Sequence, residues 1–127
     1  MKRKYINKKE GNRDLLRRTE CLYNAINSTE ILVLDYREIF DDAVRYMYSE
    51  PINEYSERDI NAIMVNSIRH NYSNYDQVLR GPYGINRSEY DYAQYKNCVL
   101  NKIAHVYPSL KDECDRQKRK CDMVKIM

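Results

Sequence analysis

Residues 56–71 read SERDINAIMVNSIRHN, and this stretch decides the fold class. Its apolar face repeats every three and four positions, as on one side of an α-helix. The residues of that face are Ile60, Ile63, Met64, Ser67 and Ile68. Ser56 with Asp59 three positions later is a capping signal in which Asp replaces the usual Glu. We therefore predict a helix that begins after Ser56 and ends near Asn71.

Helical spacing continues on both sides of this stretch. The expected helices cover residues 12–27, 30–50, 57–71, 74–80, 89–107 and 109–125. Only three Gly and three Pro occur in 127 residues, too few for a many-turned β-sandwich or barrel. The predicted fold is all-α: a compact bundle of five or six helices. A basic flexible arm, residues 1–11, precedes a single helical domain, residues 12–127, which ends in a charged helix.

The most apolar tetrad, Ile31-Leu32-Val33-Leu34, has two interpretations. It fits a short buried strand, and it also fits the first turn of the helix that Pro51 ends. Because no second strand candidate is present to pair with it, we predict that residues 31–34 are helical.

Tyrosine is unusually abundant, with 13 Tyr against one Phe and no Trp. Helical spacing places one group of tyrosines on core faces: Tyr23, Tyr36, Tyr92, Tyr95 and Tyr107. A second group lies near a central corner and loop without an assigned structural role: Tyr72, Tyr75, Tyr83 and Tyr90. If that second group is exposed, we expect the corner to be a binding surface; if it is buried, tyrosine substitutes for Leu and Phe.

The formal charge of +3 is unevenly distributed. Residues 1–18 carry a local charge of +6, residues 19–110 carry −5, and residues 111–127 carry +2. Basic ends around an acidic middle favour contact with a polyanion or with an acidic protein surface, although charged ends also keep a small domain soluble.

Several classes of protein are excluded by what the sequence lacks. No apolar run approaches the length of a membrane span, and no secretory signal precedes the first helix. The four cysteines form no C-x-x-C pair, so we expect reduced thiols, no metal and a cytoplasmic location. No Gly-rich phosphate loop or nucleophile motif is present, so we expect no cofactor and no enzymatic activity.

The densest polar cluster runs from Ile68 to Asp76 and forms a corner between two expected helices. Arg69 lies about 180° around the helix from Ile60 and is therefore expected to point away from the core. The corner then offers an Arg/Tyr surface for phosphates and stacked bases. Two alternatives stay open: a His70–Asp76 pair for proton transfer, and a purely structural corner in which His70 bonds a backbone carbonyl.

The predicted nucleic-acid contacts combine the basic ends with this corner. They are Lys2, Arg3, Lys4, Lys8, Lys9, Arg13, Arg17, Arg18, Arg69, Tyr72, Tyr75, Lys118, Arg119 and Lys120.

The pattern Arg69-His70-x-x-Ser73-x-Tyr75-Asp76-x-x-Leu79 resembles the Arg-His-x-x-Thr-x-Tyr-Asp-x-Leu-Leu signature of a family of uncharacterised domains. The resemblance covers residues 56–107. It departs from the signature at Ser73, at Val78 or Arg80, and at Gln94, where the family has Arg. It implies that the corner is a unit with a helix on each side.

These features favour a small, non-enzymatic regulatory protein that binds nucleic acid through Lys and Arg contacts to phosphates. The alternative is a protein-binding inhibitor or adaptor, encoded by a phage or another mobile element, that occupies a host protein. The last helix has few apolar anchors, namely Leu110, Cys114, Cys121 and Val124. It is interpreted as a partner-seeking helix or as an arm that packs on a second subunit, so a homodimer is a further option.

Overall fold

The structure, a computed structural model, describes residues 2–48 and 56–122, with side chains over 13–46 and 56–121. The helices, in chain order, are α1 (Lys2–Ser28), α2 (Tyr36–Tyr48), α3 (Glu57–Asn71), α4 (Tyr75–Arg80), η1 (Ile85–Arg87), α5 (Glu89–Val106), η2 (Pro108–Leu110) and α6 (Lys111–Asp122). Within these ranges the only β contact is an isolated bridge between Ile31 and Ser73. The prediction of an all-α fold is confirmed.

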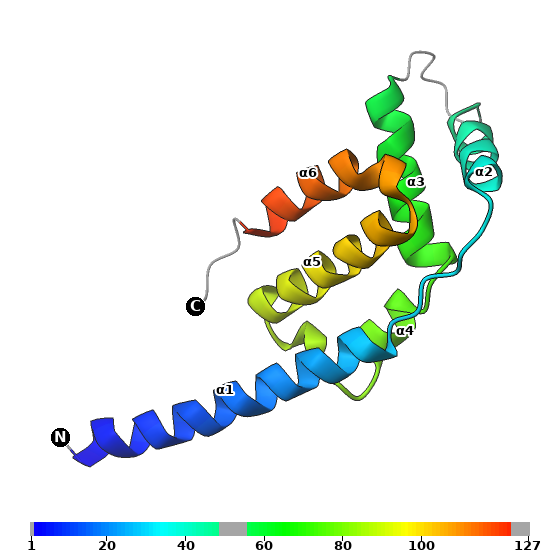
Figure 1. The fold of residues 1–127 in the computed structure, drawn as a ribbon. Helices are drawn as coiled ribbons and strands as arrows, with labels where there is room; N and C mark the ends of the chain where they lie inside the picture. The colour runs from blue at the N-terminus through cyan, green and yellow to red at the C-terminus, as the bar shows by residue number, and fades with distance from the viewer. Residues whose placement is uncertain (1, 49–55, 123–127) are drawn as a thin grey trace.

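Helix α5 lies at the centre of the molecule (Figure 1). Helices α6 and α1 pack against it, α3 contacts both α5 and α6, and α2 lies along α3. The core consists mainly of aliphatic side chains with three buried tyrosines among them, namely Tyr75, Tyr95 and Tyr107. None of the helices in the described ranges combines the length and apolar character that a membrane crossing needs.

The predicted helix starts after Ser56 and Ser88 are confirmed. Ser56 N donates to Asp59 Oδ2 over 3.0 Å and Asp59 N donates to Ser56 Oγ over 3.3 Å, which forms a reciprocal capping box. Ser88 Oγ accepts from Asp91 N over 3.1 Å. Each cap satisfies a backbone N–H that the first helical turn leaves without a partner.

The prediction that residues 31–34 are helical is wrong. The segment is extended, and α2 begins only at Tyr36. Its backbone bonds to distant parts of the chain: Leu32 N donates to the Tyr72 carbonyl over 2.9 Å. The Tyr107 hydroxyl accepts from Leu34 N and donates to the Leu32 carbonyl, each over 2.8 Å. These tertiary bonds replace the bonds that a helical turn would have formed.

Helix α1 begins at Lys2, ten residues before the expected start at Asn12. Lys, Arg and Glu are good helix formers, and the single Gly11 costs only about 1 kcal/mol in a helix interior. The helix is therefore continuous from Lys2 to Ser28, with no break near Asn12.

The predicted core role of two tyrosines is also wrong. Tyr23 on α1 is 65% exposed and Tyr36 at the start of α2 is 38% exposed. Helix α1 packs on the rest of the protein through another flank, where Ala25 is buried and Leu22 and Ile26 are partly buried. Leu15 and Leu16, which the spacing had grouped with these residues, are exposed as well.

Helix α6 packs within its own chain, so it is not an arm that packs only on a second subunit. It packs on α5 and α3, and its anchors Leu110, Cys114 and Cys121 are buried. Two polar residues of α6, Glu113 and Gln117, are buried with them and have partners inside the protein. The predicted anchor Val124 and the predicted stop at Pro51 lie outside the described residues.

Candidate functional site

Arg69 does not point to solvent, so its predicted contact with phosphate is wrong. It is 6% exposed, and its Nη1 donates to Gln117 Oε1 over 3.2 Å. The guanidinium carbon also lies 5.4 Å from the centre of the Tyr75 ring, at cation–π distance. Because α6 covers this face of α3, the side that the helical angle assigned to solvent is a helix–helix interface.

The contact between Arg69 and Gln117 continues along α6. Gln117 Nε2 donates to Glu113 Oε2 over 2.9 Å, and Arg116 Nη2 donates to the same oxygen over 2.6 Å. Burial alone would raise the pKa of Glu113, but the hydrogen bonds from Arg116 and Gln117 hold that pKa below its usual value. This polar network joins α3 to α6.

His70 and Asp76 do pair across the corner. His70 Nδ1 lies 2.9 Å and 3.0 Å from the two Asp76 carboxylate oxygens, while Nε2 lies 3.3 Å from Arg69 Nη2. A guanidinium can only donate, so Nε2 accepts and the proton resides on Nδ1. The pair therefore orients the imidazole between α3 and α4. In the purely structural alternative, only the expected partner of His70 is wrong, because His70 contacts the Asp76 carboxylate and not a backbone carbonyl.

Tyr75 is fully buried, so its predicted role as a base-stacking surface is wrong. Its ring stacks on Tyr95, with centroids 5.2 Å apart and planes at 7°. Burial raises the pKa of Tyr75, and burial also raises the pKa of Tyr95 to about 12. These two phenols remain neutral and act as core side chains.

The other corner tyrosines are half-buried. Tyr72 donates its hydroxyl to Asp42, and this hydrogen bond raises the pKa of Tyr72. The Tyr83 hydroxyl bonds Ser28 Oγ over 2.8 Å, and Tyr90 is also partly buried. Most of the corner tyrosines thus hold helices together.

Some of the basic residues predicted to contact nucleic acid are instead bonded to other side chains of the protein. Arg18 forms a two-bond pair with Asp91, at 2.7 Å and 3.1 Å. Lys118 bonds Asp115 and Asn101. The exposed members with described side chains are Arg13, Arg17, Arg119 and Lys120. Lys2, Arg3, Lys4, Lys8 and Lys9 belong to α1 by their backbone.

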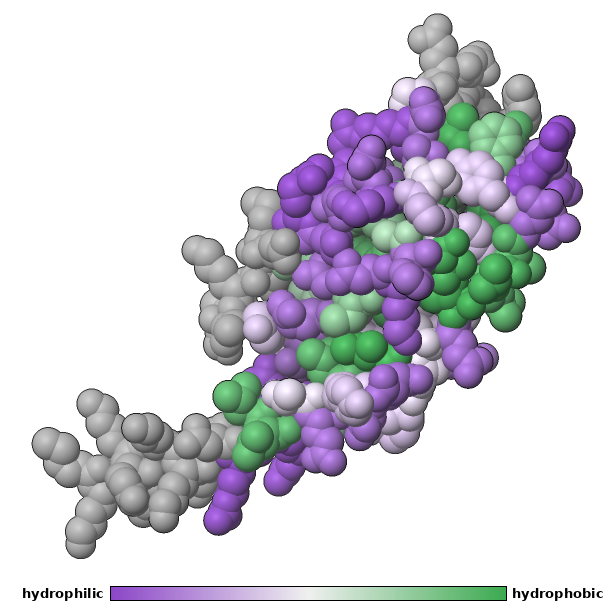
Figure 2. Space-filling model, viewed as in Figure 1, coloured by the Kyte–Doolittle hydropathy of each residue, from purple (hydrophilic) through white to green (hydrophobic). Residues whose placement is uncertain are grey.

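The N-terminal half of α1 projects from the body of the protein (Figure 1). Along α1, the pair between Arg18 and Asp91 is the most N-terminal side-chain bond to another helix in the described part of the chain. In the surface view, hydrophilic side chains cover much of the body and apolar patches lie between them (Figure 2). The accessible predicted cations with described side chains are thus divided equally between α1, which carries Arg13 and Arg17, and α6, which carries Arg119 and Lys120.

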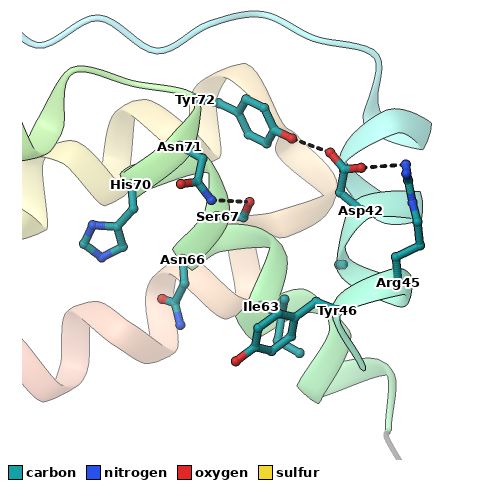
Figure 3. Close-up of a pocket in the computed structure, with 10 residues that line it drawn as sticks. Asp42, Arg45, Tyr46, Ile63, Asn66, Ser67, His70, Asn71 and Tyr72 are labelled. Carbon is teal, nitrogen blue, oxygen red and sulfur yellow. Dashed lines mark hydrogen bonds and ion pairs between the residues drawn. The ribbon is translucent and has the colours of Figure 1, made fainter. Parts of the chain in front are cut away.

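A groove of about 640 Å³ lies between α2 and α3, which the sequence patterns had not indicated (Figure 3). Polar side chains from α3 line one side of it, namely Asn66, Ser67, His70 and Asn71, and α2 contributes Asp42, Arg45 and Tyr46. In the sequence, this wall corresponds to a cluster of amide and hydroxyl side chains beside the apolar face of α3. The cluster indicates a groove only when α2 is known to lie opposite it.

No protein-family model matches the chain, and no curated protein or solved structure is significantly similar to it. The resemblance over residues 56–107 stays a prediction. In the described ranges, no group of three or more His, Cys, Asp or Glu residues is placed to hold a metal ion.

Proposed function

We propose that this protein is a non-enzymatic binding protein whose helix α1 contacts the phosphate backbone of nucleic acid. The observation that carries the proposal is that the part of α1 before Arg18 projects from the body of the protein (Figure 1). Residues 1–18 carry eight basic side chains against Glu10 and Asp14. A strongly basic helix away from the body is suited to phosphate contact, because each Lys or Arg placed on a phosphate releases condensed counterions.

The geometry favours a helix lying along a duplex. The segment from Lys2 to Arg17 spans about 24 Å at 1.5 Å per residue. A helix with its side chains is about 10–12 Å wide, which matches the major groove of B-form DNA.

The charge of the rest of the protein limits how such a complex is arranged. Residues 19–110 carry a local charge of −5 and repel phosphates. The predicted contacts in α6 are also reduced, because Lys118 is paired with Asp115. We therefore expect α1 to hold the nucleic acid while the acidic body faces away from it.

The test is fluorescence anisotropy of labelled duplex and single-stranded DNA at about 50 mM and about 200 mM salt. We expect the full chain to bind at the lower salt concentration and to lose much of that affinity at the higher one. Arg13→Ala/Arg17→Ala removes two exposed cations of α1. We expect this double variant to reduce the magnitude of the slope of log affinity against log salt concentration by about 2, because each lost phosphate contact accounts for about 0.9 of that slope.

The matched control is Arg37→Ala/Arg58→Ala. It removes the same charge from exposed positions on α2 and α3. We expect this control to keep the wild-type slope. Absence of binding at low salt, or an equal loss in both double variants, would overturn the proposal.

A second candidate function follows from a different observation on the same helix. Leu15, Leu16 and Tyr23 are 60%, 70% and 65% exposed. Exposed apolar side chains that gather on one helix are typical of a surface that contacts another protein. These side chains favour the alternative of a protein partner that packs on α1, with aromatic and Arg side chains as anchors. If Leu16→Ser abolished binding of a protein partner but left the salt dependence of DNA binding unchanged, protein binding and nucleic-acid binding would be separate functions of α1.

A further inference from the structure

We infer that the groove between α2 and α3 binds a single unpaired nucleobase. This site lies apart from the projecting half of α1, and its argument does not depend on phosphate contacts by that helix (Figure 1). The groove measures about 640 Å³, inside the size range of about 300–1,000 Å³ typical of small-molecule sites.

One part of the groove offers a surface for a flat ring. Tyr46 reaches from α2 toward α3, and its side chain is 57% exposed (Figure 3). Ala43 and Ile63 also line the groove, from α2 and α3 respectively, and supply apolar contact. A base–aromatic stack contributes about 1–3 kcal/mol and tolerates any base, because every base has a π face.

Two amides on α3 add hydrogen-bonding groups. Asn66 Oδ1 accepts from Arg69 Nη2 over 3.3 Å, and Asn71 Nδ2 donates to Ser67 Oγ over 3.2 Å. Within the described part of the chain, Asn66 Nδ2 and Asn71 Oδ1 have no protein partner. In this arrangement Asn66 Nδ2 can donate to a ligand and Asn71 Oδ1 can accept from one. The edge of a nucleobase carries the complementary acceptor and donor.

The charges of the groove favour a neutral ligand. Arg45 Nη2 donates to Asp42 Oδ1 over 2.7 Å, and the other Asp42 oxygen accepts from the Tyr72 hydroxyl. The cation and the carboxylate compensate each other, so the groove has no surplus positive charge to hold a phosphate. A neutral heteroaromatic ring fits this environment better than a nucleoside triphosphate.

A nucleobase can come from a free nucleoside or from a single-stranded polymer, and the test separates these sources. Backbone and side-chain amide signals of the full ¹⁵N-labelled chain are followed by NMR while adenosine, guanosine, cytidine or uridine is added. A parallel series adds a short single-stranded oligonucleotide at a salt concentration that suppresses phosphate contacts by α1. We expect the side-chain amides of Asn66 and Asn71 to shift in at least one series.

Two variants and a control complete the test. Asn66→Leu and Tyr46→Ala each remove one proposed contact, and each should weaken binding about 10-fold, as expected for loss of one hydrogen bond or one stacking contact with the ligand. Asn86→Leu, which changes an exposed amide on η1 outside the groove, should bind as the wild type does.

Shifts with nucleosides assign the site to free ligands, and shifts with the oligonucleotide alone assign it to unpaired bases of a strand. Absence of shifts in both series would overturn the inference. Wild-type affinity of Asn66→Leu and Tyr46→Ala would overturn it as well. None of these outcomes depends on the salt slope measured for Arg13 and Arg17, so this inference and the proposed function can fail separately.

Discussion

Helices α6 and α1 are both highly charged, yet only α6 is packed along its described length. Nine of the twelve residues of α6 are charged. Its apolar anchors are buried, and Glu113 and Gln117 are hydrogen-bonded inside the protein. The N-terminal half of α1 carries a similar density of charge and projects away from the other helices.

Charge density therefore does not decide whether a helix packs. What decides it is whether its polar groups find partners on the opposite surface. Arg69 on α3 supplies such a partner for α6. On α1, the pair between Arg18 and Asp91 is the most N-terminal bond of this kind in the described structure, and the residues before Arg18 project beyond it. Burial of a polar group is unfavourable unless it is hydrogen-bonded, so the burial of Glu113 and Gln117 depends on the donors that Arg116 and Arg69 supply.

The largest effect is expected from an apolar anchor of the packed region. Leu110→Ala removes a fully buried side chain just before α6 and should lower the free energy of unfolding by about 3 kcal/mol. Leu16→Ala on α1, where the side chain is 70% exposed, should change it by less than about 0.5 kcal/mol. Urea denaturation measures both values. Equal losses in the two variants would show that α1 is also packed in solution.

The next effect concerns the polar network. Arg69→Met keeps most of the side-chain volume but leaves Gln117 Oε1 buried without its donor. We expect a loss of about 2–3 kcal/mol, because a buried acceptor without a partner incurs its full desolvation cost. Arg58→Ala, an exposed position on the same helix, is the control and should be nearly neutral. A stable Arg69→Met protein would mean that α6 packs through its apolar anchors alone.

A smaller effect is expected at the extended segment. Tyr107→Phe removes the hydroxyl that bonds both Leu34 N and the Leu32 carbonyl, which should lower stability by about 1–2 kcal/mol. Hydrogen exchange should become faster at the Leu34 amide. The Leu32 amide, which donates to the Tyr72 carbonyl, serves as the internal reference. Unchanged exchange at Leu34 would show that other contacts hold the segment.

The smallest effect is a pH dependence. Because the pKa of Glu113 is lower in the folded protein than its ordinary value of 4.5, its contribution to stability is present above that value. The contribution is lost as the pH falls through the lower, folded value. Glu113→Gln should therefore show a shallower loss of stability below about pH 4.5 than the wild type. The exposed Asp112→Asn on the same helix is the comparison; an identical profile for Glu113→Gln and the wild type would contradict this assignment.

The helices themselves were largely predictable, and the candidate site was not. The capping box at Ser56 and the long helix after Ser88 depend on neighbouring residues, and local spacing predicts them correctly. The outward direction of Arg69 was inferred from the angle around one helix, which contains no information about a second helix covering it. The groove between α2 and α3 was missed for the same reason, since its two walls come from different helices.

The sequence alone determined the all-α class, most helix boundaries, and the concentration of positive charge in residues 1–18. These follow from apolar spacing, caps and composition, which act over a few residues. Tertiary structure alone decided that Ile31 to Leu34 are extended, that Tyr75 is core, and that Arg69 serves α6. In each case the deciding partner lies far along the chain, so only the folded arrangement brings the two groups within hydrogen-bond or packing distance.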